Sequence, residues 1–410
     1  MKCRHCQTEL QTLFLDLGYA PPSNAYLTLH SLTLPEKHYP LRVWVCESCW
    51  LVQTEDYNDA DELFAADYAY FSSFSSTWLA HAQDYVAKMT ARFDLNDQSQ
   101  VIEVAANDGY LLQYVKDKGI PCLGIEPTHS TAEAARAKGI EVIEDFFGVN
   151  LAQLLVVQGK SADLMAANNV LAHVPDINDF VKGFALLLKP SGVATFEFPH
   201  LLRLVEDTQF DTVYHEHFSY LSLTAIRHIF AENGLIVFDV EQLPTHGGSL
   251  RVFAQTTEGE RPVEQRVADV LELETQAGMN DVNFYQNFQA KANKVKNDLL
   301  LFLLNAKRDG KTVAGYGAAA KGNTLLNYAG VRPDLLPYIV DLNPAKQHKF
   351  LPASHIPIVD ELKLQDTKPD YVLILPWNLR EEIMNQLSYI REWGGQFVTA
   401  VPELSISSDR

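Results

Sequence analysis

The stretch VIEVAANDGYLL, residues 101–112, joins one short apolar run to another through a loop of small and polar residues. This order is typical of a buried strand, a tight loop and a helix. Gly109 lets a ligand approach the backbone closely, and the first turn of the helix offers unpaired amide groups. The stretch therefore predicts a ligand-binding loop at the carboxyl end of a strand.

Short apolar runs alternate with amphipathic stretches on the C-terminal side of this loop. We expect strands at 122–126, near 142, at 163–167 and at 193–198, with helices between them. That alternation predicts an α/β fold with a doubly wound parallel sheet. Two further runs, at 235–240 and 249–255, have no helix between them, so we expect the sheet to finish with antiparallel strands.

The pattern also divides the chain into parts. A helical spacing of apolar residues fills the later half of 68–93, and 260–308 lack strand patterns and break near Gly278. We expect a small module at 1–60, a sheet domain at 61–257, a helical connector at 258–308 and a second α/β lobe at 309–410. The strands expected in the second lobe lie at 311–317, 338–341, 371–376 and 396–401.

Four of the five cysteines form two C-x2-C pairs, Cys3 with Cys6 and Cys46 with Cys49. Together the pairs supply four thiolates, the ligand set of a tetrahedral structural zinc site. A redox-active pair and two disulfides are the alternatives. Redox chemistry needs only one pair, however, and stable disulfides are rare in the cytoplasm. Since no ligand position stays open, we expect the zinc to stabilise the fold and to take no part in catalysis.

The charge and hydropathy of the chain restrict its partners. Its 410 residues include 52 acidic and 33 basic side chains, a net charge of −19, and such a surface repels phosphate backbones. No apolar run is long enough to cross a bilayer, and the N-terminus lacks the apolar core of a signal peptide. We therefore expect a cytoplasmic monomer that binds neither nucleic acid nor a membrane.

The spacing of glycine and polar residues in the loop at 101–112 indicates which ligand it binds. The loop lacks the G-x-G-x-x-G of NAD-binding loops and resembles the loop of S-adenosylmethionine (SAM)-dependent methyltransferases, with Ala105 in place of the first glycine. Glu126 ends the second strand, where a carboxylate can accept two ribose hydroxyls. A nucleotide fold with another ligand, or none, is the alternative. We expect SAM contacts at Glu103, Ala105, Asn107, Gly109, Glu126, Phe146 and Asn168.

Residues 214–220, YHEHFSY, concentrate proton-transfer groups after the fifth strand. In an extended conformation the two histidines would share one face, and Tyr214, Glu216 and Phe218 the other. Three interpretations stay open: a polar loop with satisfied histidines, a metal site, and proton transfer beside a methyl donor. The third has a specific chemistry, because a carbon nucleophile is made by removing a proton α to a ketone. A tyrosine or a second histidine can hydrogen-bond the enolate oxygen that develops.

Together these motifs resemble the sugar C-methyltransferases that act on nucleotide-activated 4-keto-deoxysugars. The resemblance covers almost the whole chain. It is carried by the paired cysteines and by YAYFSS, VIEVAANDGYLL, NNVLAHVPD, FEFPH, YHEHFSYLSL, HGGSLRVF and GYGAAAKGNTLLN. It implies SAM-dependent methylation at C-3, a zinc module, a SAM domain and a Rossmann-like C-terminal lobe. The substrate, a TDP-type keto-sugar, would lie between the lobes with its diphosphate held by the protein.

The resemblance also implies roles for single residues. His217 would be the base at C-3, whereas spacing alone does not decide between it and His215. Tyr214 and Glu216 would line the same site. His173, in LAHVPD, and Tyr68, in DYAYFSS, would complete the pocket.

The stretch GYGAAAKGN, residues 315–323, follows a strand of the second lobe and opens a helix. Its glycine spacing departs from the dinucleotide pattern, so a diphosphate held by backbone amides and Lys321 is the better interpretation, with NAD or no ligand as alternatives. We expect substrate contacts at Lys321, Asn323, His200 and Ser249. An O- or N-methyltransferase and a non-catalytic scaffold are the competing functions, and the clustered proton-transfer groups favour the C-methylating enzyme.

Overall fold

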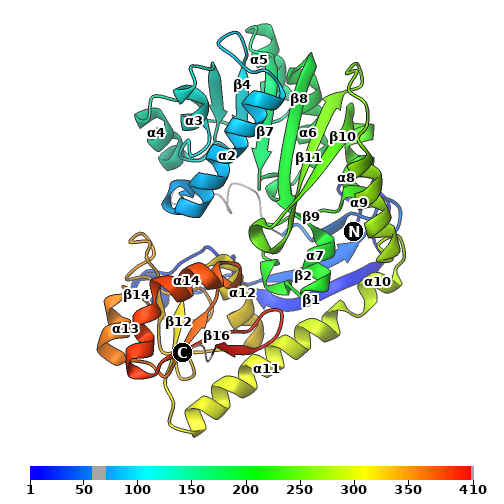
Figure 1. Cartoon of the computed structure of the whole chain (residues 1–410). Helices are drawn as coiled ribbons and strands as arrows, with labels where there is room; N and C mark the ends of the chain where they lie inside the picture. The colour runs from blue at the N-terminus through cyan, green and yellow to red at the C-terminus, as the bar shows by residue number, and fades with distance from the viewer. Residues whose placement is uncertain (58–70, 408–410) are drawn as a thin grey trace.

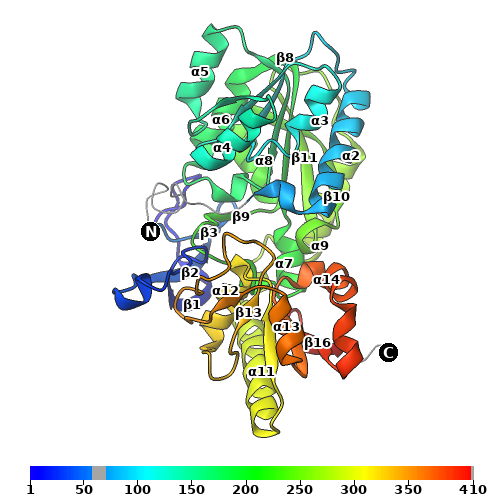
Figure 2. The ribbon, with the colours of Figure 1, turned by 90° about the vertical axis from the view of Figure 1, so that its left-hand side faces the viewer.

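The computed structural model describes residues 1–57 and 71–407, and these contain three β-sheets. Figure 1 shows two α/β lobes, one built on a seven-stranded sheet and the other on a six-stranded sheet. A four-stranded N-terminal sheet lies between the lobes in both views (Figures 1 and 2). The predicted α/β class is confirmed. Within the described residues, no helix combines the length and the apolar character that a membrane crossing requires.

The seven-stranded sheet has the order β10-β11-β8-β7-β4-β5-β6. Its strands are β4 (Val101–Val104), β5 (Cys122–Ile125), β6 (Glu141–Ile143), β7 (Ala162–Asn168), β8 (Leu188–Pro199), β10 (Leu235–Leu243) and β11 (Ser249–Thr256). β11 runs antiparallel to both β8 and β10, and the other neighbours are parallel. The antiparallel finish is therefore confirmed, with β11 inserted inside the sheet and β10 at its edge.

Helices cover both faces of this sheet (Figure 1). They are α2 (Ser76–Arg92), α3 (Leu112–Asp117), α4 (His129–Ala137), α5 (Val149–Val157), α6 (Ile177–Leu187) and α8 (Leu223–Glu232); the short α7 (Leu201–Glu206) follows β8. The helical spacing expected in 68–93 is confirmed from Ser76 onward. There α2 buries Ala82, Tyr85, Val86 and Met89 on one face, and its N-terminus is capped by the Ser75 side chain.

The N-terminal sheet consists of β1 (Thr12–Ala20), β2 (Tyr39–Val45), β3 (Val52–Thr54) and β9 (Ser219–Tyr220). The fourth strand is the end of the YHEHFSY stretch, so this sheet is completed by residues from the neighbouring lobe. Tyr220 pairs with Val52, and Ser219 with Gln53. Residues 214–217 instead form a turn, in which the backbone N–H of residue 217 donates to the carbonyl oxygen of residue 214 at 2.9 Å. The extended conformation expected here is wrong for those four residues, because the chain reverses before it pairs with β3.

The connector between the lobes contains α9 (Gln265–Gln276), the single turn α10 (Asn283–Gln286) and the long α11 (Phe288–Arg308). The predicted break is confirmed at Gly278, whose φ of 89° favours glycine. The Phe288 ring at the start of α11 stacks on Phe14 of β1 with a centroid separation of 4.7 Å. The connector is thus packed against the N-terminal sheet.

The six-stranded sheet of the C-terminal lobe has the order β14-β13-β12-β15-β16-β17. Its elements are β12 (Val313–Tyr316), β13 (Ile339–Val340), β14 (Ile358–Val359), β15 (Tyr371–Ile374), β16 (Gln396–Thr399), β17 (Ser405–Ser407), α12 (Ala320–Ala329), α13 (Leu362–Thr367) and α14 (Arg380–Gln386). The four predicted strands are confirmed. β14 and β17 escaped prediction because two or three residues are too short for a recognisable period.

One cluster of buried apolar side chains runs through the N-terminal sheet, α7, α11 and the C-terminal lobe. Val43, Leu202, Leu303 and Leu326 are representative members, each at 0% exposure. These parts share a core, so their relative arrangement is fixed by apolar burial.

Candidate functional site

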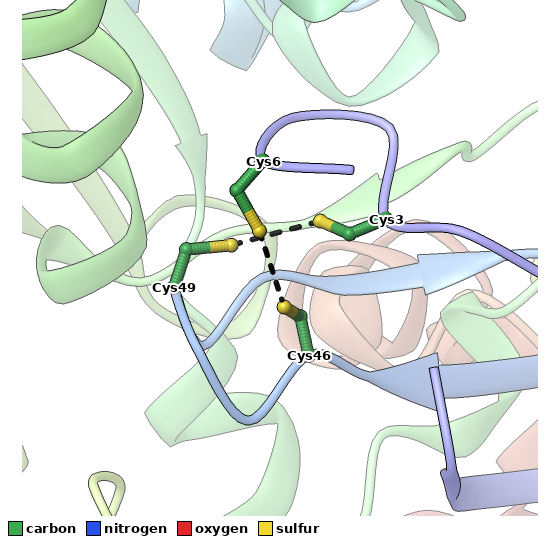
Figure 3. A group of neighbouring side chains, drawn as sticks. All are labelled: Cys3, Cys6, Cys46 and Cys49. Carbon is green, nitrogen blue, oxygen red and sulfur yellow. Dashed lines mark hydrogen bonds between the residues drawn. The ribbon is translucent and has the colours of Figure 1, made fainter. Parts of the chain in front are cut away.

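The four paired cysteines converge at the edge of the N-terminal sheet (Figure 3). Their sulfur atoms all lie within 4.8 Å of one another; Cys3 and Cys49 are separated by 3.6 Å, and Cys6 and Cys46 by 3.5 Å. A tetrahedron with Zn–S bonds of about 2.3 Å has sulfur–sulfur edges of about 3.8 Å. All four are free thiols, which excludes the disulfide alternative. The geometry and the donor set fit zinc.

The loop after β4 holds three residues in the left-handed region. Ala105, Asn107 and Gly109 have φ values of 57°, 48° and 75°. The conformation at Ala105 is the one that glycine adopts without strain, which is why a glycine is usual at this place in the resembled loop. At Gly109 a side chain is excluded as well, because an added Cβ would lie 2.4 Å from Ile140 Cδ1.

Glu126, at the end of β5, fixes this loop. Its carboxylate accepts hydrogen bonds from the backbone N–H of Asn107 at 2.9 Å, from that of Thr128 at 3.0 Å and from the Thr131 hydroxyl at 3.1 Å. The side chain is buried, and its oxygens lie directly beneath the loop. Glu126 therefore stabilises the conformation of the loop through these hydrogen bonds, whatever ligand the loop binds.

Polar groups at the ends of the neighbouring strands lack partners. Neither amide atom of Asn168, at the end of β7, has a hydrogen-bond partner among residues 1–57 and 71–407, and the same holds for Asp108 Oδ1. Burial raises the pKa of Glu103, on β4, well above its usual value. Phe146, after β6, is 49% exposed. A buried polar atom without a partner is costly, so these strand ends suit a ligand with both polar and apolar parts.

His217 lies in the turn between η4 (Phe210–Thr212) and β9. Its Nδ1 is 2.9 Å from the Thr212 carbonyl oxygen. A carbonyl only accepts, so Nδ1 carries the proton and Nε2 keeps its lone pair. Burial lowers the pKa of His217 well below its usual value, and the charges of His173 and Lys321 act in the same direction. The imidazole is thus neutral at pH 7 with one nitrogen able to accept a proton.

Two further groups pack on this imidazole. The ring centroid of His217 lies 3.9 Å from that of Tyr214 and 4.6 Å from that of His173. His173 follows β7 in a 3-10 turn (Leu171–His173), and burial lowers its pKa to about 4. The structure therefore brings together the base that the resemblance implied and two of the residues expected to line its pocket, Tyr214 and His173. Tyr68, also expected in that pocket, lies outside the described residues.

The structure separates the two histidines of the YHEHFSY stretch. His215 turns toward the N-terminal module, where its Nε2 is 3.2 Å from the Pro40 carbonyl oxygen and its ring packs edge-on against Tyr39. Glu216 is buried at 1% exposure, and one of its carboxylate oxygens is 3.2 Å from Asn24 Nδ2. Burial raises the pKa of this carboxyl group. Both side chains thus contact the N-terminal module, which periodicity did not predict.

The C-terminal lobe contributes Lys321 and Trp377 to the same region. The Lys321 ammonium lies 4.5 Å from the centre of the Trp377 ring and donates to Asn378 Oδ1 at 2.7 Å. The Trp377 indole N–H donates to Asp211 at 2.8 Å, and burial raises the pKa of this carboxyl group to about 6. Asp211 precedes Thr212, which holds His217. The second lobe is therefore linked to the histidine turn through hydrogen bonds and one buried positive charge.

A further histidine reaches this region from the HGGSLRVF stretch. His246 has a left-handed backbone at φ 55°, its ring packs on Trp78 at 5.2 Å, and burial lowers its pKa to about 4. The following residue, Gly247, has no room for a side chain, because a Cβ would lie 2.6 Å from the Trp377 ring. Sequence reasoning quoted this stretch but assigned no role to His246. No sequence motif pointed to Asp211 or Trp377 as residues of this region.

Three predicted substrate residues are engaged within the protein instead. His200 Nε2 is 2.7 Å from a carboxylate oxygen of the buried Glu274, Ser249 donates to the Thr245 carbonyl at 2.9 Å, and Asn323 donates to the Ser23 carbonyl at 2.9 Å. All three are buried. These contacts join loops to one another, and the substrate contacts expected for these three residues stay a prediction.

Three family models match the chain. They describe a zinc binding domain (residues 3–64), a methyltransferase domain (78–240) and a C-methyltransferase C-terminal domain (244–402). The C-methyltransferase NovU from Streptomyces niveus is 32% identical over 407 residues, which cover 99% of this chain and 97% of NovU. A ubiquinone biosynthesis O-methyltransferase from Bordetella avium (strain 197N) is 29% identical over 99 residues, 24% of this chain and 41% of that protein. Magnesium protoporphyrin IX methyltransferase (ChlM) from Synechocystis PCC 6803, solved with bound SAM, is 17% identical, covers 44% of this chain and 79% of its own, and has a TM-score of 0.34.

The cysteine geometry predicts about one zinc ion per chain in the purified protein, measured by elemental analysis. Cys3→Ser and Cys46→Ser should lose the metal and unfold at a lower temperature, because the bound metal contributes to folding. Cys122→Ser is the matched control, since Cys122 lies on β5 outside the cluster, and it should retain the zinc. Protein with no zinc and four freely titratable thiols would contradict this assignment.

Proposed function

The chain belongs to the family of SAM-dependent C-methyltransferases, and from this membership we propose that it methylates C-3 of a nucleotide-activated 4-keto-deoxysugar. Membership of a C-methyltransferase family favours transfer to carbon over the O- and N-methyltransferase alternatives. It also favours an enzyme over the non-catalytic scaffold. The observation that carries the proposed chemistry is the unprotonated Nε2 of a half-buried, neutral His217 whose Nδ1 is held by a backbone carbonyl.

A carbon nucleophile has to be generated before the methyl group can move. The proton on C-3, α to the C-4 ketone, is acidic enough for removal by a positioned base and leaves an enolate. His217 Nε2 would accept that proton. The enolate carbon would then take the methyl group that SAM supplies, as the sulfur–methyl bond breaks, S-adenosylhomocysteine leaves and the C-4 ketone re-forms. Because Nδ1 is bonded to the Thr212 carbonyl, the imidazole keeps the orientation and tautomer that this step requires.

The developing negative charge lies on the C-4 oxygen and needs a donor. Tyr214 packs on the His217 ring, and its hydroxyl can donate a hydrogen bond to an oxygen placed beside it. The neutral His173 directs its one ring proton to the Glu216 carbonyl, so it supports the turn and is not the donor. Glu216 supports the turn through its bond to Asn24. These assignments give the base to His217, the enolate donor to Tyr214 and the support of the turn to His173 and Glu216.

The strand ends beside the histidines fit SAM. When bound, SAM supplies an electrophilic methyl group on a sulfonium. The Asp108 carboxylate, the Glu103 carboxyl group and the Asn168 amide, which has no partner among residues 1–57 and 71–407, would offer partners for the amino acid part, which carries an ammonium group. The loop 105–109 with Glu126 beneath it would hold the ribose, and the exposed Phe146 the adenine ring.

Lys321 is the proposed contact for the substrate diphosphate. It projects from the start of α12 in the C-terminal lobe, and its charge lowers the pKa of His217 in the other lobe, so it lies between the two. Burial lowers the pKa of Lys321 itself, and an anion beside the ammonium group would relieve that cost. A TDP-type sugar nucleotide supplies such an anion.

Replacing His217 by asparagine deletes the basic nitrogen while keeping a polar side chain. Methyl transfer should fall about 10²–10⁴-fold, the usual contribution of a positioned base, and SAM binding should persist. His215→Asn is the matched control and should retain most of the activity, because that ring faces the N-terminal module. Mass spectrometry after incubation with SAM and a panel of nucleotide 4-keto-sugars measures the gain of one methyl group.

The proton-removal step can be isolated from methylation. With S-adenosylhomocysteine in place of SAM, the wild-type protein in D₂O should introduce deuterium at C-3, because deprotonation needs no methyl group. His217→Asn should lose this exchange. A variant that methylates poorly but exchanges deuterium at the wild-type rate would show that His217 is not the base.

Activity should persist to unusually low pH for a histidine base. The base acts unprotonated, and its pKa is held below the usual value near 6.5, so kcat/KM should stay level from pH 8 to below 6.5 and fall only under more acidic conditions. Lys321→Met removes a positive charge that depresses this pKa, so the acid limb should move to higher pH. A wild-type acid limb above pH 7 would contradict the assignment.

Glu126→Ala should weaken SAM binding at least tenfold, about 1.4 kcal/mol, because it removes both the proposed ribose contact and the support of the loop. Glu133→Ala, on the exposed face of α4, is the control and should bind SAM normally. Isothermal calorimetry measures both. Unchanged affinity in Glu126→Ala would place the ribose elsewhere.

A further inference from the structure

Arg4 lies between the first two zinc ligands, yet its side chain extends away from the metal toward the loops that carry both histidines. Its two terminal nitrogens donate to the carbonyl oxygens of Pro175 at 2.9 Å and Thr54 at 3.0 Å. We propose that Arg4 is a positioning residue, through which the zinc module holds His217 and His173 in register. This inference rests on the proposed role of His217 as the base.

The first connection runs through Thr54 of β3. Its hydroxyl donates to the His217 carbonyl at 3.1 Å, and its backbone N–H donates to the Phe218 carbonyl at 3.1 Å. The Arg4 guanidinium holds the Thr54 carbonyl and also lies 5.2 Å from the centre of the Phe218 ring. The backbone at 217–218 is therefore held by Thr54, and Thr54 is in turn held by Arg4.

The second connection runs through Pro175, two residues after His173. The Phe218 N–H donates to the Ala172 carbonyl at 2.8 Å, so the two histidine loops are also bonded to each other. The two imidazole centroids are separated by 4.6 Å. Arg4 bonds both the segment after His173, at Pro175, and Thr54, which bonds the segment at His217. Displacement of the Arg4 guanidinium would therefore change the relative position of the two imidazole rings.

The base of Arg4 is tied to the cysteine cluster. The Arg4 N–H donates to Gln53 Oε1 at 2.8 Å, and Gln53 Nε2 lies 3.2 Å from Cys3 Sγ. Gln53 is fully buried and pairs with Ser219 of β9. The Arg4 side chain is only 5% exposed, and Asp56 lies 2.7 Å from it, which balances its charge. A planar guanidinium held in this way is a rigid spacer, whereas a lysine places a compact charge on a flexible stem and lacks the fixed fork.

The magnitude of the effect follows from the geometry of proton transfer. A displacement of about 1 Å at a reacting group can cost about 10²-fold in rate. Arg4→Met should therefore lower kcat about 10–100-fold while zinc content and SAM affinity stay at wild-type values. Arg4→Lys should recover part of the loss. Arg42→Met is the matched control, because Arg42 bonds Glu55 and Tyr57 within the N-terminal module; it should keep the wild-type kcat.

A second measurement needs no substrate. In protein labelled with ¹⁵N-histidine, the imidazole signals of His173 and His217, assigned by the His173→Asn and His217→Asn variants, should shift in zinc-loaded Arg4→Met. They should also shift in wild-type protein stripped of zinc, and they should stay in place in Arg42→Met. A merely structural loss of stability would leave the signals of the folded molecules unchanged.

The outcomes separate the two proposals. Wild-type imidazole signals in zinc-loaded Arg4→Met overturn the positioning role, whatever the activity, and so does an equal loss of kcat in Arg42→Met. Shifted signals, together with a wild-type protein that methylates no keto-sugar, reject the proposed function and retain the positioning role. If Arg4→Met does not fold, Arg4→Lys takes its place, and unshifted signals in that variant overturn the proposal equally.

Discussion

The pairing of β3 with β9 is the constraint on which the site depends. Only two residue pairs form it, Gln53 with Ser219 and Val52 with Tyr220, yet they join the cysteine module to the chain immediately after His217. The bonds from Thr54 to the carbonyls of residues 217 and 218 extend the same junction. A four-thiolate site is closed to substrate, but here its sheet includes β9, which begins two residues after His217. The zinc module, which the sequence predicts to stabilise the fold, is therefore also bonded to the chain beside His217.

Burial sets the chemistry of the cluster. Partial burial lowers the pKa values of His173, His217 and His246, and the charge of Lys321 acts in the same direction on His217 and His246. Neutral imidazoles are what an α-proton abstraction needs, since a protonated ring cannot accept a proton. The opposite shifts at Glu216 and Asp211 follow from the same burial. One physical cause thus gives neutral bases and weakly acidic carboxyl groups together.

Sequence periodicity was informative where segments are long and repetitive. The alternation after residue 100 predicted the strands of the large sheet, and the two cysteine pairs predicted the metal cluster. It failed for residues 214–217, because a four-residue turn has no period, and for β9, whose partner lies more than 160 positions earlier in the chain. The contacts of His200, Asn323 and Ser249 were equally hidden, because a polar side chain near a motif looks the same whether it faces a ligand or a carbonyl of its own chain.

The composition of the N-terminal sheet also has a consequence for biosynthesis. The cysteine ligands and β3 leave the ribosome first, while β9 follows about 165 residues later, which takes about 8–33 seconds at 5–20 residues per second. During that interval β3 is an open edge with unpaired amide and carbonyl groups, a template for wrong pairing. The four cysteines are therefore available to the metal before β9 completes their sheet, and the chain beside His217 joins a module whose other three strands were synthesised earlier.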